Sequence, residues 1–254
     1  MSKTIVMIHG MCGGGWYWRE YQQFFEAAGY QCLAPYLPYH EVDPNTEPHP
    51  ALGEMSLLDY ANALEALIRT LPEKPILMGH SMGGLLTQIL AARQLADAVV
   101  LITPASPAGI LALKPSVVKS FLPVLTRWNF WKKPFKLDYD TVEYAMLHRV
   151  PESQRRGLFD RMVHESGHAA FEIGYWLFDS KNASKVNAED VTCPMLVIGA
   201  AEDRITPASV VRQVARKYPQ AQYREYDQHA HWIIGEPNWE RVAGETLAWV
   251  NALH

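Results

Sequence analysis

The sequence is poor in cysteine. Its 254 residues contain only three, Cys12, Cys32 and Cys193, which lie far apart and in no metal-ligand spacing. So few scattered thiols make no disulfide framework, which predicts a reducing compartment, and we expect the cytoplasm. No apolar run is long enough to span a bilayer. Met1-Ser2-Lys3 leads directly into a strand pattern, so we expect no secretory leader.

The chain also lacks an excess of charge of either sign. Lys and Arg number 23 and Asp and Glu number 27, which gives a formal net charge of −4. This balance gives no reason to expect nucleic acid or an acidic membrane surface as a partner. Hydrophobic residues are 48% and charged residues 20%, as in an ordinary globular enzyme. The length suits one large α/β domain with an insertion.

Short aliphatic runs predict buried strands, and helical patterns separate them. We expect strands at residues 4–8, 31–34, 76–78, 98–102, 194–199 and 223–226, and helices at 16–28, 56–70, 85–95 and 239–252. This alternation predicts a mostly parallel central sheet with helices on both faces. Ser56 and Asp59 form a capping-box pattern at a helix start. Thr206 is expected as an N-cap, with Pro207 at the first helical position.

The alternation stops between about Pro107 and Asp190, where no clear strand is visible and aromatic residues are frequent. We therefore expect a core domain of residues 1–106 and 191–254, interrupted by a mainly helical cap, or lid, at residues 107–190. An insertion that follows a strand covers the carboxyl ends of the sheet, where ligands bind in α/β folds. We expect a few of its aromatics to line an apolar pocket, and the cap to be more mobile than the sheet.

A glycine-flanked serine lies between a predicted strand and a predicted helix. The residues are Gly79-His80-Ser81-Met82-Gly83, and this context is typical of a nucleophile elbow. The glycines remove the Cβ atoms that would clash in so sharp a turn, and the turn presents the serine hydroxyl above the sheet. Ser81 is therefore the predicted nucleophile. The alternative is a Gly-Ser turn in an ordinary strand-to-helix connection.

A serine nucleophile needs an imidazole to take its proton and a carboxylate to orient the imidazole. Along the chain the order is serine, acid, histidine, each on a loop after a strand. Asp203 follows a predicted strand and is the natural acid, with Glu202 as the alternative. His229 and His231 compete as the base in the last loop.

Over nearly its whole length, the expected cap excepted, the chain resembles an α/β-hydrolase. The likeness is carried by His9-Gly10, Gly79-His80-Ser81-Met82-Gly83, Asp203 four before Pro207, and His231 five before Glu236-Pro237. The resemblance implies the α/β-hydrolase fold. It favours His231 over His229, because the family's histidine commonly lies five before such an acidic ending. His229 is then expected to be a solvated loop residue and His80 a structural one.

The resemblance also implies an oxyanion hole made by the backbone N–H groups of Met11 and Met82. The first third is similar to plant methylesterases and hydroxynitrile lyases, through residues 9–18 and Ala28-Gly29-Tyr30. The lyases carry a threonine and a lysine where this chain has Gly10 and Trp232. The likeness therefore implies ester hydrolysis rather than lyase activity.

The segment His164-Glu165-Ser166-Gly167-His168 matches a metalloprotease motif inside the expected cap. On one helix the two histidines would share a face, but Gly167 weakens a helix interior. No third ligand stands out, although Glu172 is nearby. We expect a polar helix face there, and neither a metal nor a cofactor.

Together these patterns predict a serine hydrolase with a Ser81-Asp203-His231 triad. The specific expectation is a carboxylesterase that cleaves apolar, short- to medium-chain esters through an acyl-enzyme. Its partner is a small apolar ester, with no nucleic acid and no membrane span, and a homodimer stays open. The alternatives are an acyltransferase or perhydrolase, a carbon–carbon bond hydrolase on the same triad, and a non-catalytic small-ligand receptor of the same fold.

Overall fold

A computed structural model describes residues 3–253. Its main sheet has six strands in the order β2-β1-β3-β4-β7-β8, and every neighbouring pair is parallel. The strands are β1 (Thr4–Ile8), β2 (Gln31–Leu33), β3 (Ile76–His80), β4 (Ala98–Ile102), β7 (Met195–Ala200) and β8 (Ala221–Tyr226). The predicted mostly parallel sheet is confirmed.

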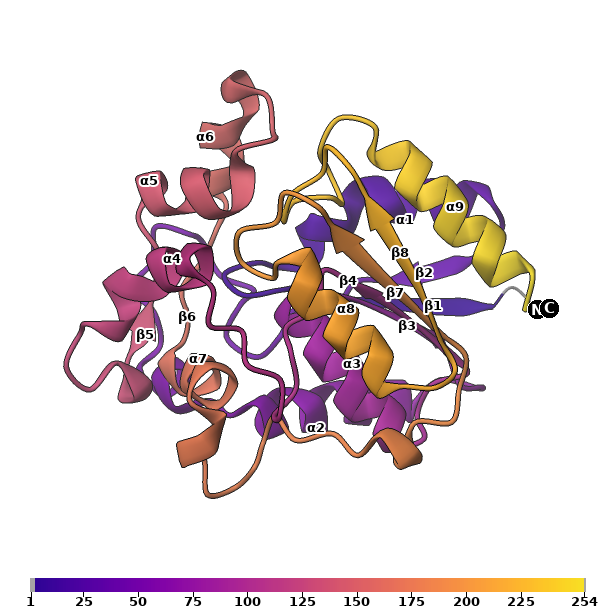
Figure 1. Cartoon of the computed structure of the whole chain (residues 1–254), viewed down its shortest axis with the longest axis horizontal. Helices are drawn as coiled ribbons and strands as arrows, with labels where there is room; N and C mark the ends of the chain where they lie inside the picture. The colour runs from indigo at the N-terminus through magenta and orange to yellow at the C-terminus, as the bar shows by residue number, and fades with distance from the viewer. Residues whose placement is uncertain (1–2, 254) are drawn as a thin grey trace.

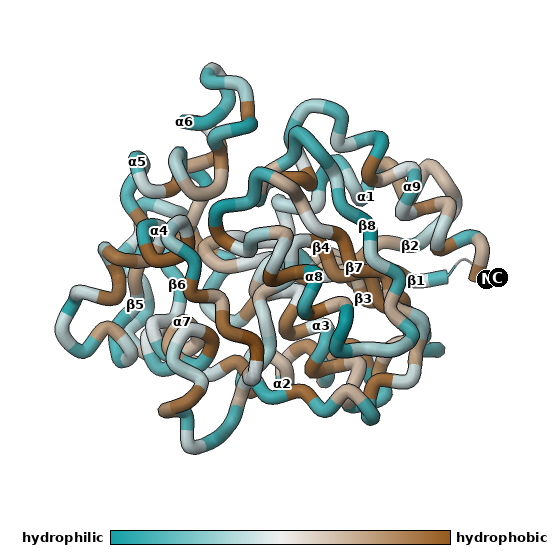
Figure 2. The backbone as a smooth tube through the Cα atoms, viewed as in Figure 1, coloured by the Kyte–Doolittle hydropathy of each residue, from teal (hydrophilic) through white to brown (hydrophobic). Residues whose placement is uncertain are grey.

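Helices cover both faces of this sheet, as expected (Figure 1). One face carries α1 (Arg19–Ala27) and α9 (Trp239–Asn251), and the other carries α2 (Leu57–Ile68), α3 (Met82–Ala92) and α8 (Ala208–Lys217). Strands β1, β3, β4 and β7 are buried along their whole length, which is why their sequences are continuously apolar. In Figure 2 the centre of the sheet is coloured brown, which marks hydrophobic residues.

Two helix starts test the capping predictions. The Ser56 hydroxyl accepts the N–H of Leu58 at 3.1 Å and the Asp59 carboxylate accepts the N–H of Ser56 at 2.9 Å, so the capping box is confirmed. The prediction for Thr206 is wrong by one residue. Pro207 itself precedes α8, and the Thr206 side chain is occupied by a contact with a carboxylate described below.

The chain between β4 and β7 leaves the sheet and forms a separate group of short elements (Figure 1, left). They are α4 (Pro115–Leu125), β5 (Pro134–Phe135), α5 (Tyr139–Val142), a π-helix (Glu143–Leu147), α6 (Glu152–Asp160), β6 (Glu165–Ser166) and α7 (Gly167–Gly174). Short 3-10 helices lie at Gly15–Trp18, Pro50–Glu54, Phe130–Lys132, Trp176–Phe178 and Ala188–Asp190. We call residues 107–190 the inserted segment.

The expectation that the inserted segment has no strand is wrong in one detail. β5 and β6 form an antiparallel pair, with Phe135 opposite Glu165. Each strand has only two residues, too few for an apolar alternation to show in the sequence. The division into a core and a cap domain stays a prediction.

The sheet order determines where a site can form. From β1 the chain passes to β2 on one side, whereas β3 and β4 lie on the other. At such a switch point the loops after neighbouring strands leave in opposite directions and open a crevice. The loop after β1 indeed lies against the turn after β3, since a Cβ on Gly10 would come within 2.8 Å of the Ser81 Cβ. Within residues 3–253, no helix is long and apolar enough to cross a membrane.

Candidate active site

Ser81 occupies a strained turn between β3 and α3. Its backbone has φ 56° and ψ −121°, a conformation that non-glycine residues rarely adopt. A Cβ on Gly79 would collide with the Gly83 carbonyl, and one on Gly83 with the Ile8 carbonyl. The two glycines are therefore needed for this turn to pack against its neighbours. Such strain costs about 1–3 kcal/mol and persists only where the surrounding structure enforces it.

The three residues predicted as nucleophile, base and acid lie in one hydrogen-bonded row. His231 Nε2 is 2.9 Å from Ser81 Oγ, and His231 Nδ1 is 2.8 Å from Asp203 Oδ2. All three are almost completely buried, and Ser81 is the most exposed at 8%. This is the geometry in which an imidazole can take a serine proton while a carboxylate holds its tautomer.

Asp203 is fixed from several sides after β7. Its Oδ1 accepts the N–H groups of Ile205 at 2.7 Å and Thr206 at 2.8 Å. Burial alone would raise the pKa of Asp203, but the neighbouring His231 and these backbone donors lower it below its ordinary value. Asp203 is therefore an ionised carboxylate, suited to stabilise an imidazolium.

Thr206 contacts both Asp203 and His231, although the sequence predicts it as a helix N-cap. Its hydroxyl lies 2.8 Å from Asp203 Oδ2, 2.9 Å from the Thr103 carbonyl and 3.3 Å from His231 Nδ1. It thus links the acid loop to the end of β4. The sequence signal for this contact is that Thr206 lies three residues after Asp203, but the same residue also matches a helix N-cap pattern.

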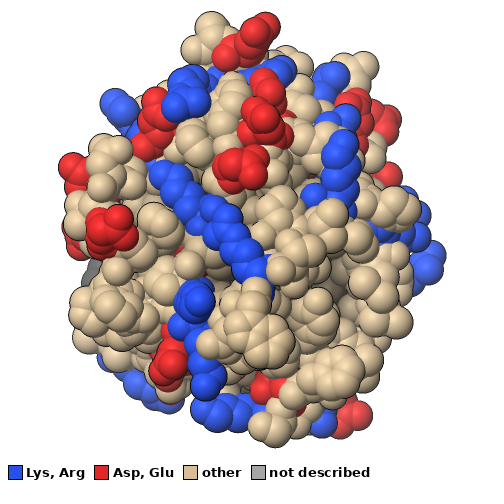
Figure 3. Space-filling model, turned by 90° about the vertical axis from the view of Figure 1, so that its left-hand side faces the viewer, with Lys and Arg blue, Asp and Glu red and all other residues tan. Residues whose placement is uncertain are grey.

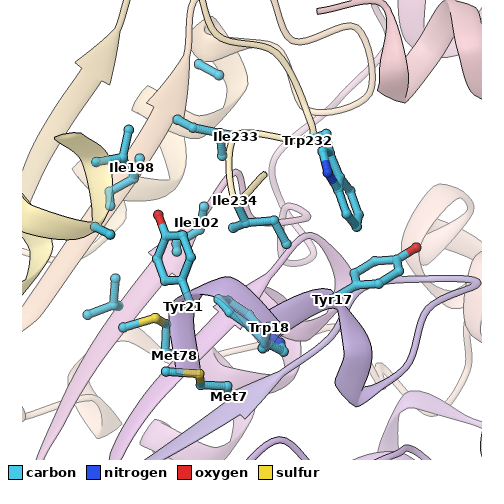
Figure 4. Close-up of a cluster of buried hydrophobic side chains, with 14 of the residues drawn as sticks. Met7, Tyr17, Trp18, Tyr21, Met78, Ile102, Ile198, Trp232, Ile233 and Ile234 are labelled. Atoms are coloured by element: carbon cyan, nitrogen blue, oxygen red, sulfur yellow. The ribbon is translucent and has the colours of Figure 1, made fainter. Parts of the chain in front are cut away.

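His231 is supported from behind by His80 and by an aromatic cluster. His80 is buried, and burial lowers its pKa to about 3, so its neutral ring donates from Nε2 to the His231 carbonyl at 2.8 Å. The structural role expected of His80 fits this contact. Trp232 and Tyr17 point toward each other in Figure 4, with ring centroids 4.6 Å apart. The Tyr17 hydroxyl donates to the Met11 carbonyl at 3.2 Å, which ties the cluster to the loop after β1.

The alternative acid, Glu202, and the alternative base, His229, lie outside the row of Ser81, His231 and Asp203. The Glu202 side chain is 44% exposed and lies 3.8 Å from Arg149. His229 is not the solvated residue we expected, because it is only 5% exposed and its Nδ1 is 3.2 Å from Glu236 Oε2. The same Glu236 oxygen accepts the N–H of Ala230 at 2.8 Å. Glu236 therefore fixes the histidine loop from within, which explains why His229 is enclosed.

Two backbone N–H groups flank the nucleophile. Met82 is the first residue of α3, so its N–H has no partner within the helix and lies at the positive end of the helix dipole. The Gly10 carbonyl, in the peptide bond that precedes Met11, accepts a hydrogen bond from His9 Nδ1 at 2.8 Å. Both methionines line the same cavity as Ser81. The two residues predicted to supply the oxyanion N–H groups thus lie in its wall, and the role of these N–H groups stays a prediction.

The metalloprotease-like motif is interrupted by a change of secondary structure. His164 precedes β6, whereas His168 lies in α7, so the two histidines do not share a helix face. The intervening Glu165 is fully buried. Within the described part of the chain, no group of three or more His, Cys, Asp or Glu residues is arranged to hold a metal ion.

A cavity of about 340 Å³ opens at Ser81 and is walled mostly by the inserted segment. Its lining contains no charged side chain. Besides Ser81, Met11 and Met82, its main apolar residues are Ile110, Leu111, Leu113, Val117, Val118, Phe121, Ile173, Trp176, Leu177 and Phe178. The cavity wall is therefore mostly apolar, as is common in small-molecule sites, with a few polar groups near Ser81.

Comparison with known proteins agrees with the observed architecture. The model of a family described as alpha/beta hydrolase fold matches residues 3–237. Salicylic acid-binding protein 2 of Nicotiana tabacum is 37% identical over 87 residues, which are 33% of this chain and 32% of that protein. Polyneuridine aldehyde esterase of Rauvolfia serpentina is 33% identical over 87 residues, 33% of this chain and 31% of that protein. The aligned part therefore spans about a third of each relative.

Solved structures match over nearly the whole chain at low identity. A methylesterase from Arabidopsis has a TM-score of 0.73 and 14% identity, and the match covers 98% of this chain and 99% of that one. Tomato methylketone synthase I, with bound β-ketoheptanoate, has a TM-score of 0.75 and 17% identity, with 100% and 99% coverage. At such identities the likeness concerns the fold alone.

Proposed function

The chain belongs to the alpha/beta hydrolase family, and we propose that it is a serine esterase in which Ser81, His231 and Asp203 form the catalytic triad. The observation that carries the proposal is the buried row from Ser81 Oγ through His231 to Asp203, with separations of 2.9 and 2.8 Å. The esterases among its partial relatives support the same reaction class.

The proposed reaction has two halves. The Ser81 hydroxyl attacks the ester carbonyl carbon and passes its proton to His231 Nε2. The carbonyl oxygen becomes an oxyanion and accepts the N–H groups of Met11 and Met82. The C–O bond then breaks, and His231 gives the proton to the leaving alcohol. In the second half His231 deprotonates a water, which attacks the acyl-enzyme and releases the acid with Ser81 restored.

The ionised Asp203 holds His231 in the tautomer that presents an unprotonated Nε2 to Ser81. It also stabilises the imidazolium that forms in each half-reaction. Thr206 helps, because its hydroxyl lies 2.8 Å from the Asp203 oxygen that faces the histidine. Each oxyanion donor is expected to contribute about a hundred- to a thousandfold in rate.

For the substrate, we propose an uncharged apolar ester with a short to medium acyl or alcohol chain. The support is the cavity wall, which is aliphatic and aromatic and lacks a charged residue. A charged acid bound against the inserted segment would lose its hydration without a charged side chain to pair with.

The test combines a nucleophile variant with a set of esters. Ser81→Ala is expected to fold with an unchanged circular-dichroism spectrum and to lose ester hydrolysis. For the wild type, kcat/KM for acetyl, hexanoyl and long-chain esters of one alcohol should be highest at short or medium length. Full activity in the alanine variant would overturn the nucleophile, and a preference for charged acids would overturn the substrate class. A stably bound small ligand without turnover would favour a receptor.

A further inference from the structure

We propose that Glu165, in the inserted segment, is a positioning residue that holds the oxyanion loop, His9 to Gly13, in its working conformation. This inference rests on the esterase activity proposed above. It assigns a function to the acidic residue of the metalloprotease-like motif, which the catalytic row does not use.

Glu165 is a fully buried carboxylate that accepts four hydrogen bonds. Its Oε2 accepts the Cys12 N–H at 3.2 Å and His40 Nε2 at 3.1 Å. Its Oε1 accepts the Tyr60 hydroxyl at 2.8 Å and the N–H of Ser166 at 2.7 Å. Three of these donors lie outside the inserted segment, so Glu165 joins that segment to the core at the edge of the oxyanion loop.

His40 supplies the positive charge that lets Glu165 remain ionised. Its Nδ1 is 2.9 Å from the Pro38 carbonyl, and its Nε2 faces the carboxylate. Both partners are acceptors, so both ring nitrogens carry a proton and the ring is an imidazolium. Burial would lower the pKa of His40, but Glu165 raises it above the ordinary value. Burial would likewise raise the pKa of Glu165, and His40 with the other donors lowers it.

Cys12 is the point where this pair acts on the loop. Its φ is 58°, in the left-handed region that a residue with a Cβ avoids. Both of its backbone polar groups bond to the inserted segment. The N–H goes to Glu165, and the carbonyl accepts the N–H of Val163 at 3.0 Å. A strained conformation needs such outside restraints, so the inserted segment holds the loop in this shape.

The Met11–Cys12 peptide is consequently fixed at both ends. Its carbonyl accepts the Tyr17 hydroxyl at 3.2 Å and its N–H donates to Glu165. The preceding carbonyl, that of Gly10, is held by His9. These contacts restrain Met11, the residue proposed to donate its N–H to an oxyanion beside Ser81. Without Glu165, the loop loses the restraint on one side of this peptide.

The charge of the pair also affects the reaction. A lone carboxylate beside the loop would repel the developing oxyanion, because charges act strongly in a poorly solvated site. The adjacent His40 imidazolium cancels most of this repulsion. Glu165 and His40 can thus hold the loop by charge-assisted hydrogen bonds without adding net negative charge near the reaction centre.

The chain offers a matched control in Glu172, the other buried carboxylate of the inserted segment. It accepts the Ser56 hydroxyl and the N–H of Leu57, both at 2.7 Å, so it also joins the segment to the core. These partners lie at the start of α2, and neither belongs to the oxyanion loop. Glu172→Gln therefore removes a comparable buried anchor without changing the loop.

The experiment compares Glu165→Gln with Glu172→Gln in the full-length protein. A glutamine has one acceptor oxygen and cannot satisfy all four donors of Glu165. We expect kcat for a hexanoyl ester to fall about tenfold or more in Glu165→Gln, since a misdirected donor loses part of its hundred- to thousandfold contribution. KM should stay within about twofold, because ground-state binding to the apolar wall is unchanged. Glu172→Gln should keep kcat within about twofold, even if both variants unfold at lower temperature.

A second readout isolates the oxyanion hole. An alkylboronic acid adds to the serine as a tetrahedral anion, so its inhibition constant should rise in Glu165→Gln by about the same factor as kcat falls. If Glu165→Gln does not fold, His40→Gln undergoes the same two measurements, with the same expected direction. Equal kcat and inhibition constants for the Glu165 and Glu172 variants would overturn the positioning role. A wild type without ester turnover would instead overturn the proposed function.

Discussion

Strands β3 and β4 are fully buried, whereas the inserted segment exposes Leu113, Trp128 and Phe178 by 73%, 86% and 75%. The sheet and its loops supply every atom of the proposed chemistry. The inserted segment supplies most of the cavity wall and, through Glu165, a restraint on the oxyanion loop.

The outer face of the inserted segment carries many charged side chains, unlike the buried strands of the sheet. Figure 3 shows Lys and Arg in narrow rows between broader areas of uncharged residues, with Asp and Glu interspersed. Arg127, Lys132 and Lys133 are exposed. Lys136 instead lies over the Phe159 ring at 5.2 Å. Lys136 therefore covers part of the segment's own aromatic surface.

The largest expected effect concerns the loops of the sheet. Asp203→Asn should lower kcat about 10⁴-fold, because the histidine loses its tautomer control, and His231→Ala should cost at least as much. Glu202→Gln should remain within about twofold of the wild type, since its side chain faces Arg149 and solvent. Steady-state kinetics on a nitrophenyl ester measures all three. An inactive Glu202 variant with an active Asp203 variant would show that the acid is misassigned.

A smaller effect separates two parts of the inserted segment. Helix α7 is held by Glu172, whereas α4 buries only Ser120 and Val124. We expect the amides of α4 to exchange about a hundredfold faster than those of α7, the equivalent of about 3 kcal/mol in local opening free energy. Hydrogen exchange followed by mass spectrometry tests this. Equal protection of α4, α7 and β3 would contradict a lid whose mobile part is α4.

A change in the cavity wall should alter the choice of ester and leave the chemistry intact. Ile173→Trp fills part of the cavity, so kcat/KM for a hexanoyl ester should fall about tenfold while that for an acetyl ester changes little. Trp128→Ala is the control, because Trp128 is 86% exposed and lies outside the cavity lining. An equal loss on both esters in the Ile173 variant would mean that the acyl chain does not lie there.

The smallest effect is a pH dependence of stability from the His40–Glu165 pair. Because folding raises the pKa of His40, its protonation stabilises the fold. This contribution is complete below pH 6.5, the ordinary pKa of histidine, and is lost as the pH rises through the folded-state pKa. Because folding lowers the pKa of Glu165, its ionisation also stabilises the fold. This contribution is complete above pH 4.5, the ordinary pKa of glutamate, and is lost as the pH falls through the folded-state pKa. Both contributions are therefore complete between these two values.

The measurement is the unfolding free energy of the wild type minus that of His40→Gln across pH. The difference should be largest between pH 4.5 and 6.5 and should decrease on either side of this range. The other titratable groups that interact with the pair are His9, Cys12, Tyr17 and Tyr60, and Lys136 acts on Cys12. Burial keeps His9, Cys12 and Tyr60 neutral over this range. A difference that does not vary with pH would contradict an ionised pair.

Sequence reasoning predicts the sheet region well, because its constraints are local. A buried strand, a glycine-flanked serine and an acid that follows a strand each leave a short, local pattern in the sequence. The contacts that the sequence does not predict join distant positions, such as Glu165 with His40, 125 residues apart. The same holds for the enclosed His229 and for the two-residue strands β5 and β6. For Glu165, the nearest available signal was an acidic residue in a motif that had no third metal ligand.

The central claim is that Ser81 is a nucleophile activated by His231, and covalent labelling tests it most directly. The wild type is treated with a fluorophosphonate and digested, and the modified peptide is identified by mass spectrometry. The account predicts one added phosphonyl group per chain, located on Ser81, and at least a thousandfold slower labelling in His231→Ala. Labelling at another residue, or equally fast labelling in the histidine variant, would contradict it.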